Sequence, residues 1–299
     1  MEFTWKYSAG EPTLLRTFLR DKGISRGLLA KIKFQGGLLR VNGKVENVLY
    51  TLTADDIVSV MIPDEVGHDS LVGEAVPLSI VFEDEHLLVV NKPSGVPSIP
   101  AQYHPRGTMA NRVKGYYQGK NYADQVVHIV TRLDKDTTGL MLFAKHGYAH
   151  ALMDKQLRKR TLIKKYQALV SGRQEALQKH GVIECPILRD ETSLIKRKTG
   201  AEGVEAMTEY WLSEEFKEYA LVTIQLHTGR THQIRVHFAA LGCPLVGDDL
   251  YGGNMALGLS RQALHCSELK FTHPFTGESL HLKQELPPDL NQFVMLGEL

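Results

Sequence analysis

Residues 131–139 read TRLDKDTTG and lie between two apolar runs, VVHIV at 126–130 and LMLFA at 140–144. Each run has the length and apolar content of a buried strand, so the polar stretch is predicted to be a loop at the edge of a sheet. A carboxylate held at such an edge can act as a nucleophile or a general base, and Asp134 is the candidate. The alternative is an ordinary turn whose Asp and Thr side chains bind nearby backbone amides.

Length and composition indicate a globular protein with a substantial core. The chain has 299 residues, 43% of them hydrophobic, which suggests one large domain with a small one, or two of medium size. Cys185, Cys243 and Cys266 show no CxxC spacing, so a disulfide framework is not expected. We therefore expect the protein to be cytoplasmic. No apolar run approaches the length of a membrane span, so no membrane partner is expected.

Basic residues are concentrated near the N-terminus. Although the net charge of the whole chain is only +1, Asp21 is the only acid between Leu14 and Lys44. Such a concentration is typical of a surface that binds phosphates, although a solvated basic face on a structural domain has the same composition. The basic residues of this segment are Arg16, Arg20, Lys22, Arg26, Lys31, Lys33, Arg40 and Lys44.

The same segment has a readable local structure. Apolar residues recur at helical spacing over 14–19, and Gly23 is expected to end that helix. Ser25 is predicted to be the N-cap of a second helix over 26–34. Strands are predicted over residues 38–41 and 57–62, with turns at 42–43 and 55–56.

This pattern resembles the S-four-type RNA-binding domain, a family named after a small-subunit ribosomal protein. The resemblance covers residues 14–62, and its most specific part is the turn VNGK at 41–44. We expect this α/β domain to span residues 1–63, a linker to follow over 64–76, and a second domain to span 77–299. The resemblance implies binding of structured RNA through Arg16, Arg26, Lys31, Lys33, Arg40 and Lys44.

From residue 77 the sequence is mostly strands with a few helices, which predicts an α+β class rather than repeated βαβ units. Thr231 suits the N-cap of a helix that Gly242 ends. A basic run over 155–165 is either a phosphate-facing stretch or a solvated helix end. The predicted strands cover residues 87–91, 163–170, 208–212 and 219–227.

Two groups of residues accompany Asp134 as candidates. Tyr166 shares a strand face with Lys164, although an aromatic residue on a strand is most often part of the core. His232 and Arg235 lie three residues apart and share a helical face. The histidines at 227, 232 and 237 recur every five residues, which matches no helical zinc pair, so no metal is expected.

Over most of residues 77–299 the chain resembles the RluA/RluD-type pseudouridine synthases. The motifs are EDEHLLVVNKPSG at 83–95, RLDKDTTGL at 132–140, THQIRVH at 231–237, and LHC at 264–266 followed by FTHPFTGE at 271–278. The resemblance implies a mostly antiparallel catalytic sheet, isomerisation of uridine in structured RNA, no metal or nucleotide cofactor, and a monomer. Thr131 departs from the family, which usually has histidine there, and this leaves the target uridine open.

The resemblance also implies roles for individual residues. Asp134 would be the catalytic carboxylate, Arg235 would pair with it, and Tyr166 would stack on the flipped uracil and assist removal of the C5 proton. Arg132 would fill the gap that the flipped uridine leaves, and Arg230 would meet phosphates. The carboxylate could attack the ribose C1′, attack the uracil ring, or remove a proton to give a glycal.

The expected substrate is large-subunit ribosomal RNA, with transfer RNA as an alternative. One rival function is a non-catalytic RNA-binding or ribosome-assembly factor, in which the N-terminal domain alone is active. Another is a glycoside hydrolase that uses Asp134 and Asp136 as paired carboxylates.

Overall fold

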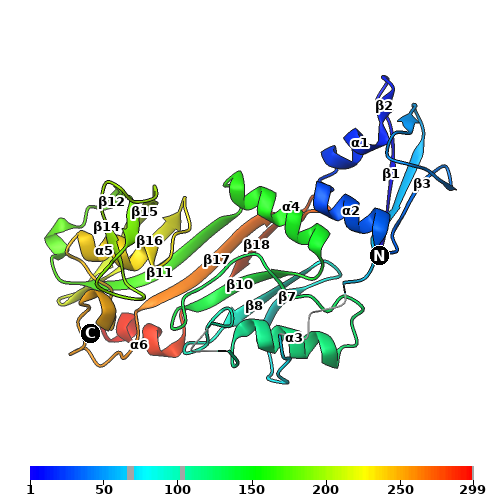
Figure 1. Cartoon of the computed structure of the whole chain (residues 1–299). Helices are drawn as coiled ribbons and strands as arrows, with labels where there is room; N and C mark the ends of the chain where they lie inside the picture. The colour runs from blue at the N-terminus through cyan, green and yellow to red at the C-terminus, as the bar shows by residue number, and fades with distance from the viewer. Residues whose placement is uncertain (66–70, 102–104, 298–299) are drawn as a thin grey trace.

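The computed structural model describes residues 1–65, 71–101 and 105–297, and it shows an α+β protein with two main sheets of unequal size (Figure 1). A four-stranded sheet lies in the N-terminal part, and a ten-stranded sheet forms the centre of the rest. The α+β class predicted from the sequence is therefore confirmed.

The N-terminal part follows the predicted order closely. Ser25 caps α2 by accepting a hydrogen bond from the Leu28 amide (3.1 Å), and Gly23 leaves α1 with φ +89°. The strand β1, which the sequence did not reveal, pairs with β6 and completes the sheet. The elements are β1 (Glu2–Lys6), β2 (Thr13–Leu14), α1 (Leu15–Asp21), α2 (Arg26–Phe34), β3 (Leu38–Val41), β4 (Lys44–Val45), β5 (Thr51–Leu52) and β6 (Ile57–Met61).

The large sheet is antiparallel except where β10 runs parallel to β17. Its strand order is β12-β15-β16-β11-β17-β10-β8-β7, with β18 beside β17 and β9 beside β10. The elements are β7 (Ile80–Glu83), β8 (Leu87–Lys92), β9 (His128–Ile129), β10 (Thr138–Ala144), β11 (Ile163–Ser171), β12 (His180–Glu184), β15 (Met207–Glu215), β16 (Tyr219–Leu226), β17 (Leu264–Thr272) and β18 (Ser279–Lys283).

The two apolar runs around the Asp134 loop differ in the structure. The run after the loop is β10, buried at every residue, but the run before it keeps only the two residues of β9 as a strand. Gly139 explains the close packing of β10 on β17, because a Cβ there would lie 2.3 Å from the Cys266 carbonyl oxygen. Its φ of +108° also favours glycine.

The helices of this part pack around the sheet, and one predicted helix start is wrong. α5 begins at Gln233, with His232 as the N-cap residue at φ +56°, rather than after Thr231. No side chain of the described residues caps α5, and the Gln233 side chain instead holds the preceding loop, since its oxygen accepts from the Arg230 amide (3.0 Å). The remaining elements are α3 (Met109–Gly119), α4 (Gly147–Arg158), η1 (Gln174–Ala176), β13 (Ile187–Arg189), β14 (Arg197–Thr199), α5 (Gln233–Ala240), η2 (Asp249–Tyr251) and α6 (Pro288–Gly297).

Side-chain contacts connect the N-terminal part to the rest of the chain. Phe3 on β1 stacks on Phe275 with ring centroids 5.1 Å apart, and the Tyr148 hydroxyl on α4 donates to the Lys22 carbonyl (2.7 Å). Glu65, at the start of the expected linker, pairs with Lys31 on α2 (2.9 Å) and accepts from the Gly147 amide (2.9 Å). Residues 66–70 of that linker lie outside the described residues.

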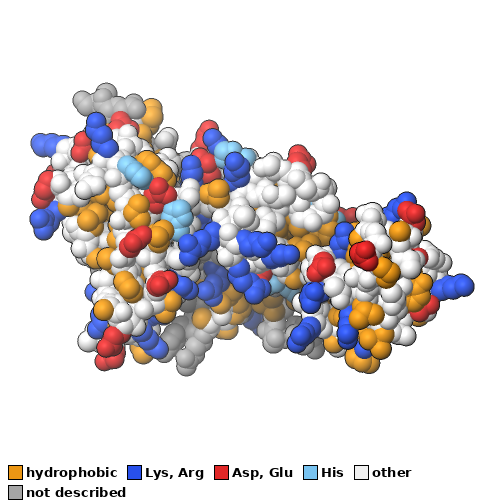
Figure 2. All heavy atoms as spheres, turned by 90° about the horizontal axis from the view of Figure 1, so that it is seen from above, with side chains coloured by type: hydrophobic (Ala, Val, Ile, Leu, Met, Phe, Trp, Pro, Cys, Tyr) orange, Lys and Arg blue, Asp and Glu red, His pale blue; other side chains and the backbone are white. Residues whose placement is uncertain are grey.

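Seen from above, Lys and Arg side chains gather near the middle of one face, between the N-terminal part on the right and the far end of the large sheet (Figure 2). Across residues 1–65, 71–101 and 105–297, no helix is both long enough and apolar enough to cross a bilayer.

Candidate active site

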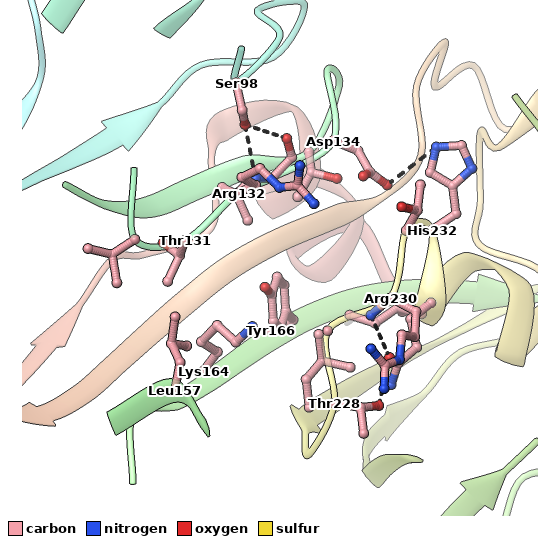
Figure 3. Close-up of a pocket in the computed structure, with 18 of the residues that line it drawn as sticks. Ser98, Thr131, Arg132, Asp134, Leu157, Lys164, Tyr166, Thr228, Arg230 and His232 are labelled. Carbon is pink, nitrogen blue, oxygen red and sulfur yellow. Dashed lines mark hydrogen bonds and ion pairs between the residues drawn. The ribbon is translucent and has the colours of Figure 1, made fainter. Parts of the chain in front are cut away.

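The loop between β9 and β10 forms part of the wall of a cavity of about 720 Å³. Asp134 lies on this loop and points toward the cavity, where its side chain keeps 28% of its surface exposed (Figure 3). The cavity is also lined by Arg132, Tyr166, Arg230 and Arg235, which come from the same loop, from β11, and from the start of α5. The fold thus brings together the five candidate residues that the sequence predicted beyond residue 77.

The backbone of the Asp134 loop is held by side chains from other segments. Ser98 donates to the Leu133 carbonyl (2.6 Å) and accepts from the Leu133 amide (3.0 Å). The Lys92 ammonium, fully buried at the end of β8, donates to the Lys135 carbonyl (2.7 Å). Arg261 donates to the Asp136 carbonyl (3.1 Å). Three groups distant in sequence therefore fix the position of the carboxylate.

Arg235 is shared between two carboxylates. Its Nε and Nη2 each lie 2.7 Å from an oxygen of the fully buried Asp248, and its Nη1 lies 3.6 Å from Asp134 Oδ2. Burial alone would lower the pKa of Arg235, but the hydrogen bonds and the charge of Asp248, together with the charge of Asp134, raise it. This two-point grip fixes the guanidinium plane and leaves one edge for Asp134.

Asp248 is a functional residue that the sequence did not identify. It stands in the stretch GDDLYG at 247–252, where two adjacent acids give no sign of which one is buried. Asp249, its neighbour, is exposed. The sequence signal for this position is weak: an acid stands among turn residues directly after an apolar stretch.

His232 lies beside the same carboxylate. Its Nε2 is 4.0 Å from Asp134 Oδ2, and its Nδ1 is 2.9 Å from the Tyr251 hydroxyl. Burial lowers the pKa of His232, against the opposing charge of Asp134, so the ring is neutral at neutral pH. The helical face predicted for His232 and Arg235 is wrong for His232, which precedes α5 as its N-cap residue, but both side chains approach Asp134.

Tyr166 lines the inner part of the cavity. Its side chain is 4% exposed, and β11 changes register against β17 between Lys165 and Tyr166, an irregularity that redirects side chains. Burial, and after it the thiol of Cys266 and the charge of Asp134, raise the pKa of Tyr166 well above its usual range. The phenol is therefore neutral, and its ring is available as a stacking surface.

Thr131 and Asp136 have structural contacts in the same loop. The Thr131 hydroxyl accepts from the Leu142 amide (2.9 Å) and so ties the loop to β10. Asp136 does not line the cavity among the described residues, and its carbonyl faces Arg261. A glycoside hydrolase with Asp134 and Asp136 as paired carboxylates is therefore wrong for this geometry, because the two side chains do not share a site.

The remaining basic candidates fall into two groups. Arg132 and Arg230 are exposed at the edge of the cavity, whereas the candidates in the N-terminal part do not line it. Lys31 pairs with Glu65 (2.9 Å), and Arg40 pairs with Glu2 (3.3 Å). Among the candidates of the N-terminal part, those that are exposed and form no ion pair with the described residues are Arg16, Arg26, Lys33 and Lys44.

The chain is similar to known proteins in sequence and in fold. Residues 86–240 match the family model described as RNA pseudouridylate synthase. The chain is 41% identical over 280 residues to the uncharacterized RNA pseudouridine synthase YjbO of Bacillus subtilis (strain 168), covering 94% of this chain and 98% of that protein. It is 37% identical over 233 residues to the ribosomal large subunit pseudouridine synthase D of Xanthomonas campestris pv. campestris, covering 73% of this chain and 69% of that protein. The structure of human RNA Pseudouridylate Synthase Domain Containing 4 matches with a TM-score of 0.60 and 25% identity, covering 73% of this chain and 92% of that one.

Proposed function

The chain belongs to the RNA pseudouridylate synthase family, whose members are isomerases acting on RNA, and from this premise we propose that Asp134, Arg235 and Tyr166 convert uridine to pseudouridine in large-subunit ribosomal RNA. The observation that carries the proposal is the carboxylate of Asp134, held 3.6 Å from a guanidinium that Asp248 locks in place. Both groups line one cavity with Tyr166.

The reaction breaks the bond between C1′ of the ribose and N1 of the uracil and forms a bond from C1′ to C5. No water is added, so a group of the protein has to manage the sugar or the ring while the base turns. Asp134 is the carboxylate placed to do this, since it lines the cavity and keeps an exposed edge. Arg235 orients it, and attack at C1′, attack on the ring and glycal formation all use the same carboxylate.

Tyr166 serves as the platform for the flipped base in this proposal. A uracil ring that stacks on the phenol recovers part of the stacking that it loses on leaving the RNA. Because burial raises the pKa of Tyr166 well above its usual range, a phenolate at neutral pH is disfavoured, and stacking is the role we assign. Arg132, exposed at the edge of the cavity, would fill the gap in the RNA stack.

The N-terminal part would bind the RNA around the target as an S-four-type domain. Its exposed cations without an ion pair in the described part of the chain support this, since such charges attract phosphates. The named function of the relative from Xanthomonas campestris supports ribosomal RNA of the large subunit as substrate. We further propose that the protein acts as a cytoplasmic monomer.

The test is release of tritium from RNA labelled at C5 of uridine. Purified protein is mixed with large-subunit ribosomal RNA transcripts or with transfer RNA transcripts, and the modified positions are then mapped. We expect release from the ribosomal RNA at one or a few positions. Release from transfer RNA alone would contradict the substrate, and release from neither would contradict the activity.

A further inference from the structure

Lys164 is a cation inside the cavity that forms no ion pair with the described residues. It precedes Tyr166 by two residues on β11, so both side chains share the strand face that lines the cavity (Figure 3). Its Nζ lies against the loop before α5, 3.5 Å from the position of a Cβ built on Gly229. Burial lowers the pKa of Lys164, and the Cys266 thiol is the one group whose charge opposes that effect. In the described part of the chain no carboxylate lies within ion-pair distance of this ammonium.

The buried cations around the cavity have polar partners within the protein. Arg235 faces Asp248, Arg261 faces Asp289 with Nε 2.7 Å from the carboxylate, and Lys92 donates to three carbonyl groups. An ammonium taken out of water without such partners is unfavourable. Lys164, which is partly exposed in the cavity, differs from these cations because no carboxylate of the described residues pairs with it, so a ligand in the cavity can supply its partner.

The arrangement of the three cavity residues indicates which part of the ligand that is. Asp134, Tyr166 and Lys164 line the same cavity, and Figure 3 shows Tyr166 between the other two in its view. Residues two apart on a strand are separated by about 6.6 Å. A uracil that stacks on Tyr166 with its sugar at Asp134 would extend its oxygen-bearing edge toward Lys164.

We propose that Lys164 is a further catalytic residue, whose ammonium hydrogen-bonds a carbonyl oxygen of the target uracil and stabilises the negative charge that the ring takes up during the reaction. This inference rests on the proposed function. When the bond from C1′ to N1 breaks, its electron pair stays on the ring and spreads over O2 and O4. C5 then bonds to C1′, C5 loses its proton, and N1 gains one, while the ammonium keeps its own protons throughout. Attack on the ring also places charge on O4, so Lys164 has the same role on each path.

Lys165 provides the matched control. It is the next residue on β11, points to the opposite face, and has its Nζ 5.9 Å from the Trp211 ring centre. The experiment compares Lys164→Met and Lys165→Met in single-turnover tritium release with enzyme in excess over RNA. We expect Lys164→Met to lower the rate constant at saturation about 100-fold, as for loss of one donor to a developing anion, with little change in RNA affinity. Lys165→Met should leave both unchanged.

The pH dependence separates a chemical role from a packing role. The wild-type rate at saturation should fall as pH rises above the lowered pKa of Lys164, because the neutral amine stabilises an anion poorly. Lys164→Arg stays protonated and should lose this fall while keeping part of the rate.

Two results would overturn the inference. One is a Lys164→Met protein with the full rate at saturation but weaker, less salt-dependent RNA binding, which is the behaviour of a phosphate contact. The other is an unimpaired variant beside an active wild type, which would remove the role of Lys164 and leave the proposed function standing. A wild type that releases no tritium would overturn the proposed function, and this inference with it.

Discussion

The cavity and the N-terminal part both display arginines, but in opposite settings. Arg235 is buried, gripped at two points by Asp248, and placed 3.6 Å from Asp134. Arg16 and Arg26 are exposed and have no ion pair in the described part of the chain. A guanidinium that takes part in chemistry needs a fixed position, whereas one that attracts phosphates needs only its charge. Substitutions in the two regions should therefore fail in different ways.

The largest effect is expected at the buried pair behind the catalytic group. Asp248→Asn leaves the Arg235 guanidinium buried without its anion, which costs about 3–5 kcal/mol of unfolding free energy. Tritium release should also be lost, because Arg235 is no longer oriented. Urea unfolding and single-turnover kinetics measure the two losses. Asp249→Asn, at the exposed neighbouring acid, should match the wild type.

The Arg235→Lys variant tests whether the reaction depends on the shape of the guanidinium or only on its positive charge. Lysine keeps the positive charge but cannot grip Asp248 at two points. We expect the rate at saturating RNA to fall about 100-fold, as for a misplaced catalytic group, with RNA affinity unchanged. A lysine variant as fast as the wild type would remove the distinction between the two regions.

The third prediction concerns His146, which lies between the two regions, with its ring 6.0 Å from that of Phe3. Burial lowers the pKa of His146 to about 3, from the ordinary 6.5. Because the unfolded chain then binds the proton and the folded chain does not, stability is complete above pH 6.5 and is lost as pH falls toward 3. Between pH 7 and 5 this histidine should account for about 2 kcal/mol of lost unfolding free energy.

His146→Gln should reduce that loss while keeping an acceptor for the Ala149 amide, which His146 now caps. Urea unfolding at the two pH values measures it. An unchanged slope for His146→Gln would show that the ring is protonated in the folded protein.

The smallest effect is expected at a single exposed arginine. Arg26→Ala should weaken RNA binding a few-fold and lower the slope of affinity against salt by about one, with the rate at saturation unchanged. Arg26→Lys should restore the affinity, unlike the corresponding change at Arg235. Filter binding over a range of salt concentrations measures both. A loss of rate at saturating RNA in Arg26→Ala would contradict the assignment of RNA binding to the N-terminal part and of catalysis to the cavity.

The sequence correctly predicted the features that depend on a local pattern of residues. Ser25 as a cap and the strand after the Asp134 loop were both found, since periodicity and turn residues determine them. The placement of Asp134, Tyr166 and Arg235 in one cavity agrees with their grouping by motif.

What the sequence missed depends on contacts between distant segments. Asp248 becomes part of the site only when the turn after β-bridge residue Leu245 is folded against α5. Lys92 and Arg261 support the Asp134 loop from positions 43 and 125 residues away in the chain, a relation that no local pattern encodes. The wrong helix start at Thr231 has a similar cause, since the loop before α5 is held by the Gln233 side chain, which also donates to Thr208 on β15, rather than by a local cap.

The central claim is that the Asp134 carboxylate performs the isomerisation. The most direct measurement is tritium release from ribosomal RNA labelled at C5 of uridine, comparing the wild type, Asp134→Asn and Asp136→Asn. The wild type and Asp136→Asn should release tritium at similar rates, because the Asp136 side chain does not line the cavity, and Asp134→Asn should release none. Release by Asp134→Asn at the wild-type rate would contradict the account.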